Sequence, residues 1–224
     1  MIETGIEGKF DLIFVLIQLF LSFKYLLFGS YFIQKSKFFL VYSCPQYIFV
    51  SKGIFLILFK ELKANENFKI GNTSFEVIFI PGHTSGHVAF YSKKEKIIFT
   101  GDTLFSLGCG RVFEGTNEQM FNSLNKFKKL PPDTKIYCGH EYTKKNLEFC
   151  IKYEPNNKYL KKKKDWINTK INSNLPSIPV SIEEELRTNI FLRCNEQEVK
   201  IALNLNNSSE QEIFTKLRDL KDNF

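Results

Sequence analysis

Three short apolar runs organise this chain: FEVIFIPGH (Phe75–His83), KIIFTGD (Lys96–Asp102) and TKIYCGH (Thr134–His140). Each run is rich in Ile, Val, Phe or Tyr, the residues that favour β-strands. Each ends in a glycine that is followed at once by a histidine or an aspartate. A glycine at a strand end lets the chain turn sharply and lets a ligand approach closely. If the three strands run in the same sense in one sheet, their last side chains meet at one edge.

The side chains that follow the three glycines, His83, Asp102 and His140, are all of a metal-ligating type. Two imidazoles and a carboxylate in one place indicate a metal site. The remaining histidine, His87, is four positions from His83, a spacing that would align the two on a helix. The intervening Thr84–Gly86 favours a loop instead. We therefore expect His87 to be structural or to support a ligand from behind.

The composition is that of a globular protein with excess positive charge. The 224 residues are 43% hydrophobic and carry a net charge of +7, which suits one large domain or a domain with an appendage. The charge favours anionic partners without separating nucleic acid from an anionic metabolite. Much of it lies in runs such as Lys161–Lys164, which usually form a solvated helix face. Five cysteines without a CxxC pair argue against a disulfide framework and favour a reducing compartment such as the cytoplasm.

Residues 1–61 form an atypical apolar segment. Leu12–Phe23 and Tyr25–Ile33 together approach the roughly 20 residues of a membrane span, but Lys24 between them is costly in lipid. No basic region or small-residue cleavage site frames the run as a signal peptide. A translated non-coding start of the reading frame is one alternative. The other is a set of buried strands, over Phe38–Tyr42, Tyr47–Val50 and Ile54–Phe59.

The next part of the chain, residues 62–156, reads as an α/β domain. Val88–Ser92 and Lys96–Thr100 predict a hairpin. Thr116 and Gln119 have the spacing of a capping box and predict a helix start. The following strand is expected over Thr134–Cys138, with a helix capped by Thr143 after it.

Residues 157–224 are expected to form a helical C-terminal domain. The boundary is indicated by a turn-forming Glu-Pro-Asn-Asn sequence at residues 154–157. Helices are predicted over Lys158–Asn172, Ser181–Thr188 and Ser208–Asp222.

Four motifs carry a resemblance to a known family: IPGHTSGH (80–87), FTGDTLF (99–105), GCGRVFEGT (108–116) and YCGHEYT (137–143). In order and spacing they resemble glyoxalase II, the hydroxyacylglutathione hydrolase branch of the metallo-β-lactamase superfamily. The resemblance runs from about residue 62 to the C-terminus. It implies an α/β fold, the αβ/βα sandwich, with a two-metal site and a helical domain over the substrate pocket.

The resemblance also implies a reaction. It is the hydrolysis of S-(2-hydroxyacyl)glutathione thioesters, such as S-lactoylglutathione to glutathione and D-lactate in methylglyoxal detoxification. His83 matches a ligand of the first metal, His140 a ligand of the second, and Asp102 the catalytic carboxylate that bridges both. The cofactors implied are two divalent metals, zinc with iron or manganese as alternatives. Two such cations share a hydroxide that attacks the thioester carbonyl.

Five positions match substrate-binding residues of the family. Arg111 stands where the family has Lys or Arg, and Tyr142 where a tyrosine contacts the tripeptide. Arg218 and Lys221 match a pair that binds the glycine carboxylate of glutathione, Arg through a bidentate fork and Lys as a point charge. Phe113 replaces a tyrosine found in some members, which removes one hydrogen bond. This set predicts a small anionic substrate rather than nucleic acid. The chain is also expected to be a monomer.

The chain also departs from the family. The His-x-His-x-Asp-His run expected upstream of His83 is absent, which leaves one terminal ligand per metal and the bridge, whereas catalytic zinc usually keeps three protein ligands. We therefore predict weak metal binding and poor or absent thioester hydrolysis by the 224-residue chain. One alternative is a non-catalytic glutathione-binding protein that keeps Tyr142, Arg218 and Lys221. Another is a persulfide dioxygenase-like member that uses one iron.

Overall fold

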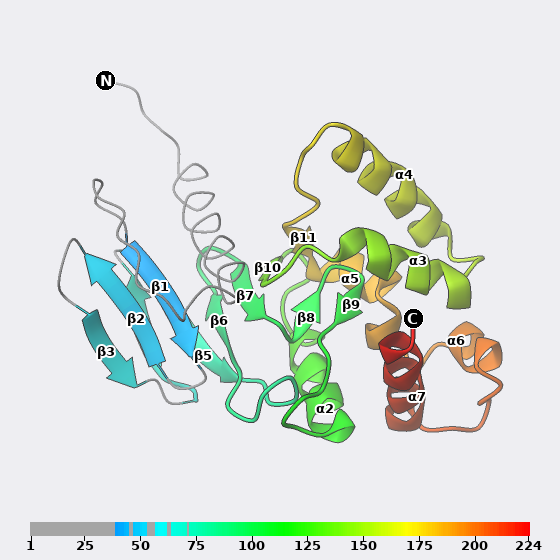
Figure 1. The fold of residues 1–224 in the computed structure, drawn as a ribbon, viewed down its shortest axis with the longest axis horizontal. Coiled ribbons are helices and arrows are strands. Elements are labelled where there is room, and N and C mark those ends of the chain that lie inside the picture. Colours follow the sequence, from blue (N-terminus) through cyan, green and yellow to red (C-terminus); the bar gives the residue numbers. More distant parts are fainter. Residues whose placement is uncertain (1–38, 45–46, 53–56, 62–63, 71) are drawn as a thin grey trace. The chain divides into compact units, whose positions relative to one another are not determined.

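The computed structural model describes residues 39–44, 47–52, 57–61, 64–70 and 72–224, with side chains described from residue 64 onward (Figure 1). The chain divides into two compact units, residues 1–63 and 64–224. The apolar runs Leu12–Phe23 and Tyr25–Ile33 lie outside the described residues. Within the described part, no helix is both long and apolar enough to cross a membrane.

The first unit contains a three-stranded antiparallel sheet. Val50 of the central strand pairs with Val41 on one side and with Leu58 on the other. Each of the three strands predicted in this region overlaps an observed strand, while Phe38 and residues 53–56 lie outside the described residues. The observed strands are β1 (Phe39–Cys44), β2 (Tyr47–Lys52) and β3 (Ile57–Glu61).

The second unit is built on a six-stranded sheet of order β11-β10-β7-β6-β5-β4. Neighbouring strands are antiparallel except β7 and β10, which are parallel. Since β6 runs opposite to both β5 and β7, the strands β5, β7 and β10 all run in the same sense. The three strands that lead into the glycines therefore run in the same sense in one sheet, which is the arrangement that lets their last side chains meet at one edge. The strands are β4 (Asn67–Ile70), β5 (Thr73–Phe79), β6 (Val88–Ser92), β7 (Ile97–Gly101), β10 (Lys135–Cys138) and β11 (Val180–Ser181).

The predicted hairpin is confirmed: β6 and β7 pair antiparallel, with Ser92 opposite Ile97. Strand β4, in contrast, was not predicted, because its polar surroundings read as a turn into the next strand. β4 is the edge strand of the sheet, and no residue in it is fully buried. It is held by backbone pairing to β5 and by Phe68, which stacks on Phe75 with ring centroids 5.5 Å apart.

Helix α2 (Asn117–Phe127) begins with the predicted capping box. The Thr116 side chain accepts a hydrogen bond from the backbone N–H of Gln119, and the Gln119 side chain accepts one from the backbone N–H of Thr116. The face that carries Met120, Leu124 and Phe127 is buried. Burial of this face fixes the crossover between β7 and β10.

The C-terminal part is helical, as predicted. The three helices predicted after residue 157 are confirmed within two residues at each end. The helix predicted from Thr143 to about Tyr153 is also confirmed. Its cap differs, because Tyr142 occupies the N-cap position and makes no side-chain capping bond, so the predicted cap by Thr143 is wrong. The short elements η2 and α6 were not predicted. The helices are α3 (Thr143–Tyr153), α4 (Lys158–Asn172), α5 (Ile182–Thr188), η2 (Ile190–Leu192), α6 (Gln197–Ala202) and α7 (Glu210–Asp222).

One hydrophobic cluster joins the sheet to these helices. Phe149 of α3, Phe191 of η2 and Phe214 of α7 are buried in it, with the Phe191 and Phe214 rings 5.9 Å apart. Phe214 also contacts Phe121 of α2 at 5.7 Å. The last helix of the chain is therefore packed against the α/β layer. An α/β fold with C-terminal helices is what the structure contains.

Candidate metal and substrate site

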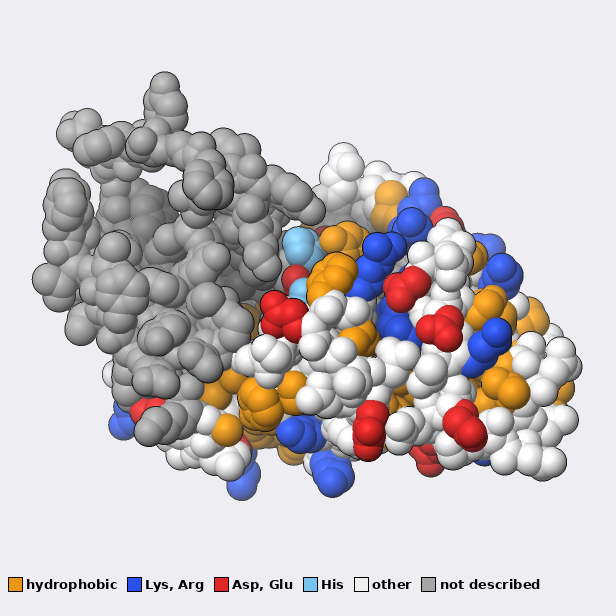
Figure 2. Space-filling model, turned by 60° about the horizontal axis from the view of Figure 1, so that its bottom comes forward, with side chains coloured by type: hydrophobic (Ala, Val, Ile, Leu, Met, Phe, Trp, Pro, Cys, Tyr) orange, Lys and Arg blue, Asp and Glu red, His pale blue; other side chains and the backbone are white. Residues whose placement is uncertain are grey.

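The loops after β5, β7 and β10 bring three predicted site residues together. His83 Nε2 lies 3.5 Å from Asp102 Oδ2, and His140 Nε2 lies 3.6 Å from Asp102 Oδ1. Both distances are longer than an ordinary hydrogen bond. Histidine side chains reach the surface in Figure 2 beside acidic and hydrophobic side chains, with Lys and Arg close by.

His87 supports Asp102 from behind. The backbone N–H of Asp102 donates a hydrogen bond to His87 Nε2 at 3.2 Å. Gly101 has a φ of +52°, and a Cβ atom built there would lie 2.6 Å from the same nitrogen. The glycine that ends β7 is therefore required both by its left-handed backbone and by the close approach of the imidazole. This is the supporting place that the sequence predicted for His87.

The ring of His83 is oriented by the loop that follows β9. His83 Nδ1 lies 2.9 Å from the carbonyl oxygen of Arg111. A carbonyl only accepts, so Nδ1 donates this hydrogen bond, and Nε2 faces Asp102. Gly110 packs beside both groups, because a Cβ there would lie 1.9 Å from the backbone oxygen of Asp102 and 3.3 Å from His83 Nδ1.

Asp102 carries the strongest electrostatic perturbation in this cluster. Burial by itself would raise the pKa of its carboxyl group, but the His140 and His83 imidazoles outweigh burial and hold the pKa well below its usual range. The carboxylate is therefore the charged form at every ordinary pH.

The donor atoms fit metal binding in type and in spacing. Two ligands on one tetrahedral zinc, each about 2.1 Å from the ion, are about 3.4 Å apart. The His83–Asp102 and His140–Asp102 pairs have this spacing. Asp102 Oδ1 is also buried without a hydrogen-bond partner among the described residues. Such an oxygen is available to a cation.

The number of donors falls short. Among the residues that the structure describes, no group of three or more His, Cys, Asp or Glu side chains could hold a metal ion. Each imidazole faces its own oxygen of Asp102, so the cluster offers two ligands per cation. Catalytic zinc usually keeps three protein ligands. The described residues therefore supply only part of the ligand set that a two-cation centre would need.

Aromatic side chains flank the cluster on both sides. Phe113 is 67% exposed and its ring centroid lies 5.1 Å from that of His83. Tyr142 is 50% exposed and stacks on His140 with centroids 5.1 Å apart. Phe105 supports Tyr142 edge-on at 5.2 Å. Two of the predicted substrate-binding residues thus border the cluster with exposed aromatic surface.

The three cations predicted to bind substrate lie just after β9 (Arg111) and on α7 (Arg218 and Lys221). Arg111 is exposed, and its Nε lies 3.5 Å from Asp222 Oδ1. Lys221 donates a hydrogen bond to the carbonyl oxygen of Lys145 at 3.2 Å, and burial lowers the pKa of its ammonium group to about 8. Arg218 differs from both, because it is only 3% exposed.

Sequence reasoning missed three residues that hold the loop after Asp102. This loop contains the small hairpin of β8 (Leu104–Phe105) and β9 (Gly108–Cys109). Asn146 donates to the carbonyl of Ser106 at 3.0 Å, Asn189 donates to that of Gly108 at 3.0 Å, and Glu185 accepts from Leu107. All three lie on or beside C-terminal helices, where polar residues ordinarily read as solvated. No local pattern distinguishes them.

Two family sequence models match the chain in succession. Residues 49–140 match the metallo-beta-lactamase superfamily, and residues 141–224 match the hydroxyacylglutathione hydrolase C-terminus. The first match begins upstream of residue 62, and the two meet between residues 140 and 141 rather than near residue 156. Successive parts of the chain therefore resemble proteins of the metallo-β-lactamase superfamily.

Curated relatives narrow this further. The chain is 54% identical over 153 residues to a hydroxyacylglutathione hydrolase of Pelagibacter ubique, covering 68% of this chain and 58% of the relative. It is 42% identical over 163 residues to relatives of the same name from Bartonella tribocorum and Methylococcus capsulatus, covering 73% of this chain and 64% of each. Within the superfamily, the chain therefore resembles the hydroxyacylglutathione hydrolase, or glyoxalase II, family. It spans about three fifths of the length of these relatives.

Proposed function

We propose that this chain serves the hydrolysis of S-(2-hydroxyacyl)glutathione thioesters, with S-lactoylglutathione as substrate and glutathione and D-lactate as products. The observation that carries the proposal is the convergence of His83 and His140 on the two oxygens of Asp102. This convergence occurs in a chain whose C-terminal part matches hydroxyacylglutathione hydrolase. We further propose that the chain works as a monomer in the cytoplasm. The described cysteines, all free and buried, support a reducing compartment: Cys109, Cys138, Cys150 and Cys194.

In this proposal His83, His140 and Asp102 would hold two divalent cations. Zinc suits such N and O donors, with iron or manganese as alternatives. Bound there, such cations supply a water of lowered pKa and polarise a carbonyl group. With two ligands per cation among the described residues, we expect weak metal affinity and slow turnover. The residues around the cluster orient its donors: His87 through the backbone of Asp102, and Arg111 through its carbonyl oxygen.

The substrate is bound by the groups that border the cluster. Exposed faces of Phe113 and Tyr142 give apolar contact on either side. Arg111 and Lys221 provide positive charge for the carboxylates of glutathione. Phe113 cannot donate a hydrogen bond, so the polar contact on its side of the substrate is lost.

A second function follows from the short supply of ligands. A chain that keeps the substrate-binding groups but not a full metal shell binds glutathione without hydrolysing its thioesters. Among the described residues there are two ligands per cation, against the three that catalytic zinc usually keeps, which favours this alternative.

A paired experiment separates the two functions. The full 224-residue chain is loaded with zinc, and thiol release from S-lactoylglutathione is followed with and without a chelator. The Asp102→Asn variant tests the bridge, and Glu148→Gln, an exposed change on α3, is the control. Chelator-sensitive release that Asp102→Asn abolishes and the control keeps supports hydrolysis.

Calorimetric binding of glutathione completes the test. Binding that Tyr142→Ala weakens, in a chain without thiol release, supports the binding function instead. A chain that neither releases thiol nor binds glutathione overturns both proposals.

A further inference from the structure

Arg218 of α7 is buried, and its guanidinium binds groups of the protein itself. Its side chain is almost fully buried, and both terminal nitrogens are engaged within the protein. Nη1 donates to the carbonyl oxygen of Cys109 at 2.9 Å and to that of Gly110 at 3.3 Å. Nη2 donates to Asp222 Oδ1 at 2.9 Å. The planar guanidinium fork suits this simultaneous contact with two carbonyls and a carboxylate.

The two carbonyls belong to the loop that holds His83. Gly110 packs on the backbone of Asp102 and beside His83, at distances that no side chain would allow. The next residue, Arg111, offers the carbonyl oxygen that accepts from His83 Nδ1. A continuous path of hydrogen bonds and close backbone contact therefore joins Arg218 on α7 to the imidazole facing Asp102.

We infer that Arg218 is a positioning residue, which fixes the Cys109–Arg111 loop and through it the orientation of the His83 ring. The C-terminal helix thereby sets the direction in which His83 Nε2 points. The proposal concerns the ligand-free chain, so it stands or falls separately from the proposed hydrolysis.

Asp222 strengthens the same arrangement. One carboxylate oxygen, Oδ1, lies 2.9 Å from Arg218 Nη2 and 3.5 Å from Arg111 Nε. It is therefore placed between the guanidinium that fixes the loop and the residue whose carbonyl orients His83. Since Asp222 is partly exposed, its replacement disturbs the core less than replacement of Arg218 does.

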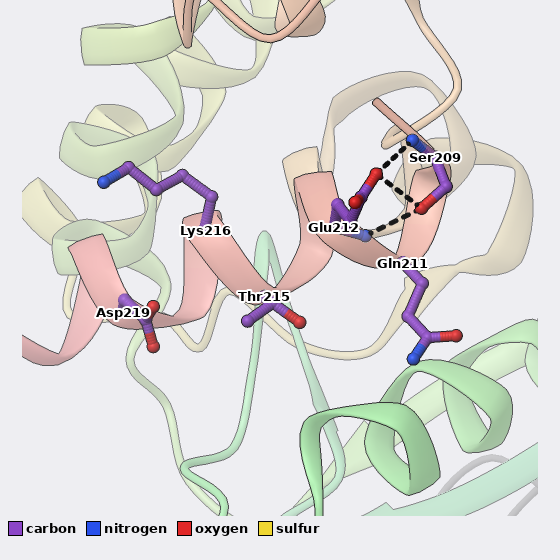
Figure 3. Close-up of a pocket in the computed structure, with 6 residues that line it drawn as sticks. All are labelled: Ser209, Gln211, Glu212, Thr215, Lys216 and Asp219. Atoms are coloured by element: carbon purple, nitrogen blue, oxygen red, sulfur yellow. Dashed lines mark hydrogen bonds between the residues drawn. The ribbon is translucent and has the colours of Figure 1, made fainter. Parts of the chain in front are cut away.

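The chain offers a matched control on the same helix. Lys216 is exposed, carries the same charge, and lies two positions from Arg218, about 200° around α7. It lines a shallow pocket of about 460 Å³ on the outer face of α7 (Figure 3). Lys216→Met therefore removes one positive charge from α7 without touching the loop.

The test reads the His83 ring directly. Because the sequence contains three histidines, a chain labelled with ¹⁵N-histidine gives three imidazole spin systems, which His83→Gln, His87→Gln and His140→Gln assign. Spectra of all variants are recorded at one fixed pH, without metal or substrate. In the wild-type chain we expect His83 to give a single set of ring ¹⁵N signals.

In Arg218→Met we expect the Nδ1 shift of His83 to move away from its wild-type value as the hydrogen bond to the Arg111 carbonyl loosens, with Arg218→Lys restoring part of the difference. Asp222→Asn is expected to give a smaller shift in the same direction, and Lys216→Met none. Circular dichroism and urea unfolding establish which variants are folded. If Arg218→Met does not fold, Asp222→Asn decides.

A substrate-binding Arg218 predicts a different result. Arg218→Met would then weaken glutathione binding while leaving the His83 shifts of the ligand-free chain unchanged. An unchanged His83 spectrum in folded Arg218→Met, or in Asp222→Asn where Arg218→Met is unfolded, overturns the proposal.

Discussion

Glu185 accepts a hydrogen bond from the backbone N–H of Leu107 at 2.8 Å, although the two residues are 78 positions apart. The same carboxylate oxygen accepts from Asn189 at 2.9 Å, while the other oxygen is buried without a hydrogen-bond partner among the described residues. Burial raises the pKa of Glu185 to about 7. An acid with a higher pKa in the folded than in the unfolded state binds protons more tightly when folded, so its ionisation opposes folding.

The first prediction concerns this carboxyl group. Its favourable contribution to the free energy of unfolding is full below the unfolded pKa near 4.5 and is lost as the pH rises through about 7. Glu185→Gln should flatten the fall in stability between about pH 5 and pH 8, since each unit of pKa shift is worth about 1.4 kcal/mol. Urea unfolding at several pH values measures the slope. The exposed Glu148→Gln should leave it unchanged, and an unchanged slope in Glu185→Gln would contradict the prediction.

The second prediction concerns Gly101. An alanine there must adopt a left-handed backbone, which costs about 1–2 kcal/mol, and its Cβ would meet His87 Nε2. Gly101→Ala should therefore lower the free energy of unfolding by more than about 1 kcal/mol. A double-mutant cycle with His87→Ala separates the two causes. If steric contact contributes, Gly101→Ala costs less in the His87→Ala background, and strict additivity would rule that contact out.

The third prediction concerns the attachment of α7. Phe214 is fully buried and its ring contacts those of Phe121 and Phe191. Phe214→Ala should lower the free energy of unfolding by about 3–5 kcal/mol, through lost burial and the cavity left behind. Urea unfolding measures the loss. Phe113→Ala, at a ring that is 67% exposed, should stay within about 0.5 kcal/mol of wild type, and equal losses in both variants would show that α7 is not held by this contact.

The fourth prediction concerns the start of α2. Thr116→Ala removes the side-chain acceptor for the Gln119 backbone N–H and should cost about 1 kcal/mol. Thr116→Ser keeps a hydroxyl group and should retain most of the stability. Thermal or urea unfolding compares the two. An alanine variant as stable as the serine variant would mean that the cap contributes nothing.

The strands that carry the site were predictable because their signal is local. An apolar run ending in glycine and a ligand marks both the strand and its end, and β6 adds an antiparallel hairpin of recognisable length. The convergence of His83 and His140 on Asp102 follows from that pattern once the strands share a sense. Strand β4 escaped prediction, since an edge strand with no fully buried residue lacks a clear apolar alternation.

The residues that brace the site were not predictable in the same way. Arg218, Glu185 and Asn189 lie far along the chain from the backbone groups they contact. Sequence spacing shows only that they sit on or beside helices. Whether such a polar side chain faces water or a distant carbonyl depends on how the helices pack, which no local period records. The family resemblance predicts substrate contact for Arg218, but no local spacing predicts that its guanidinium is buried against the Cys109–Arg111 loop.

The parallel pairing of β7 with β10 has a consequence for the order of folding. β4, β5, β6 and β7 are joined by short antiparallel connections, so the segment carrying His83 and Asp102 closes small loops. His140 is carried by β10, which can pair only after the chain has passed through α2 and returned. Longer loops cost more chain entropy to close, and non-local pairings form more slowly. We therefore expect His83 and Asp102 to meet early in folding, and His140 to arrive with the crossover as a late step.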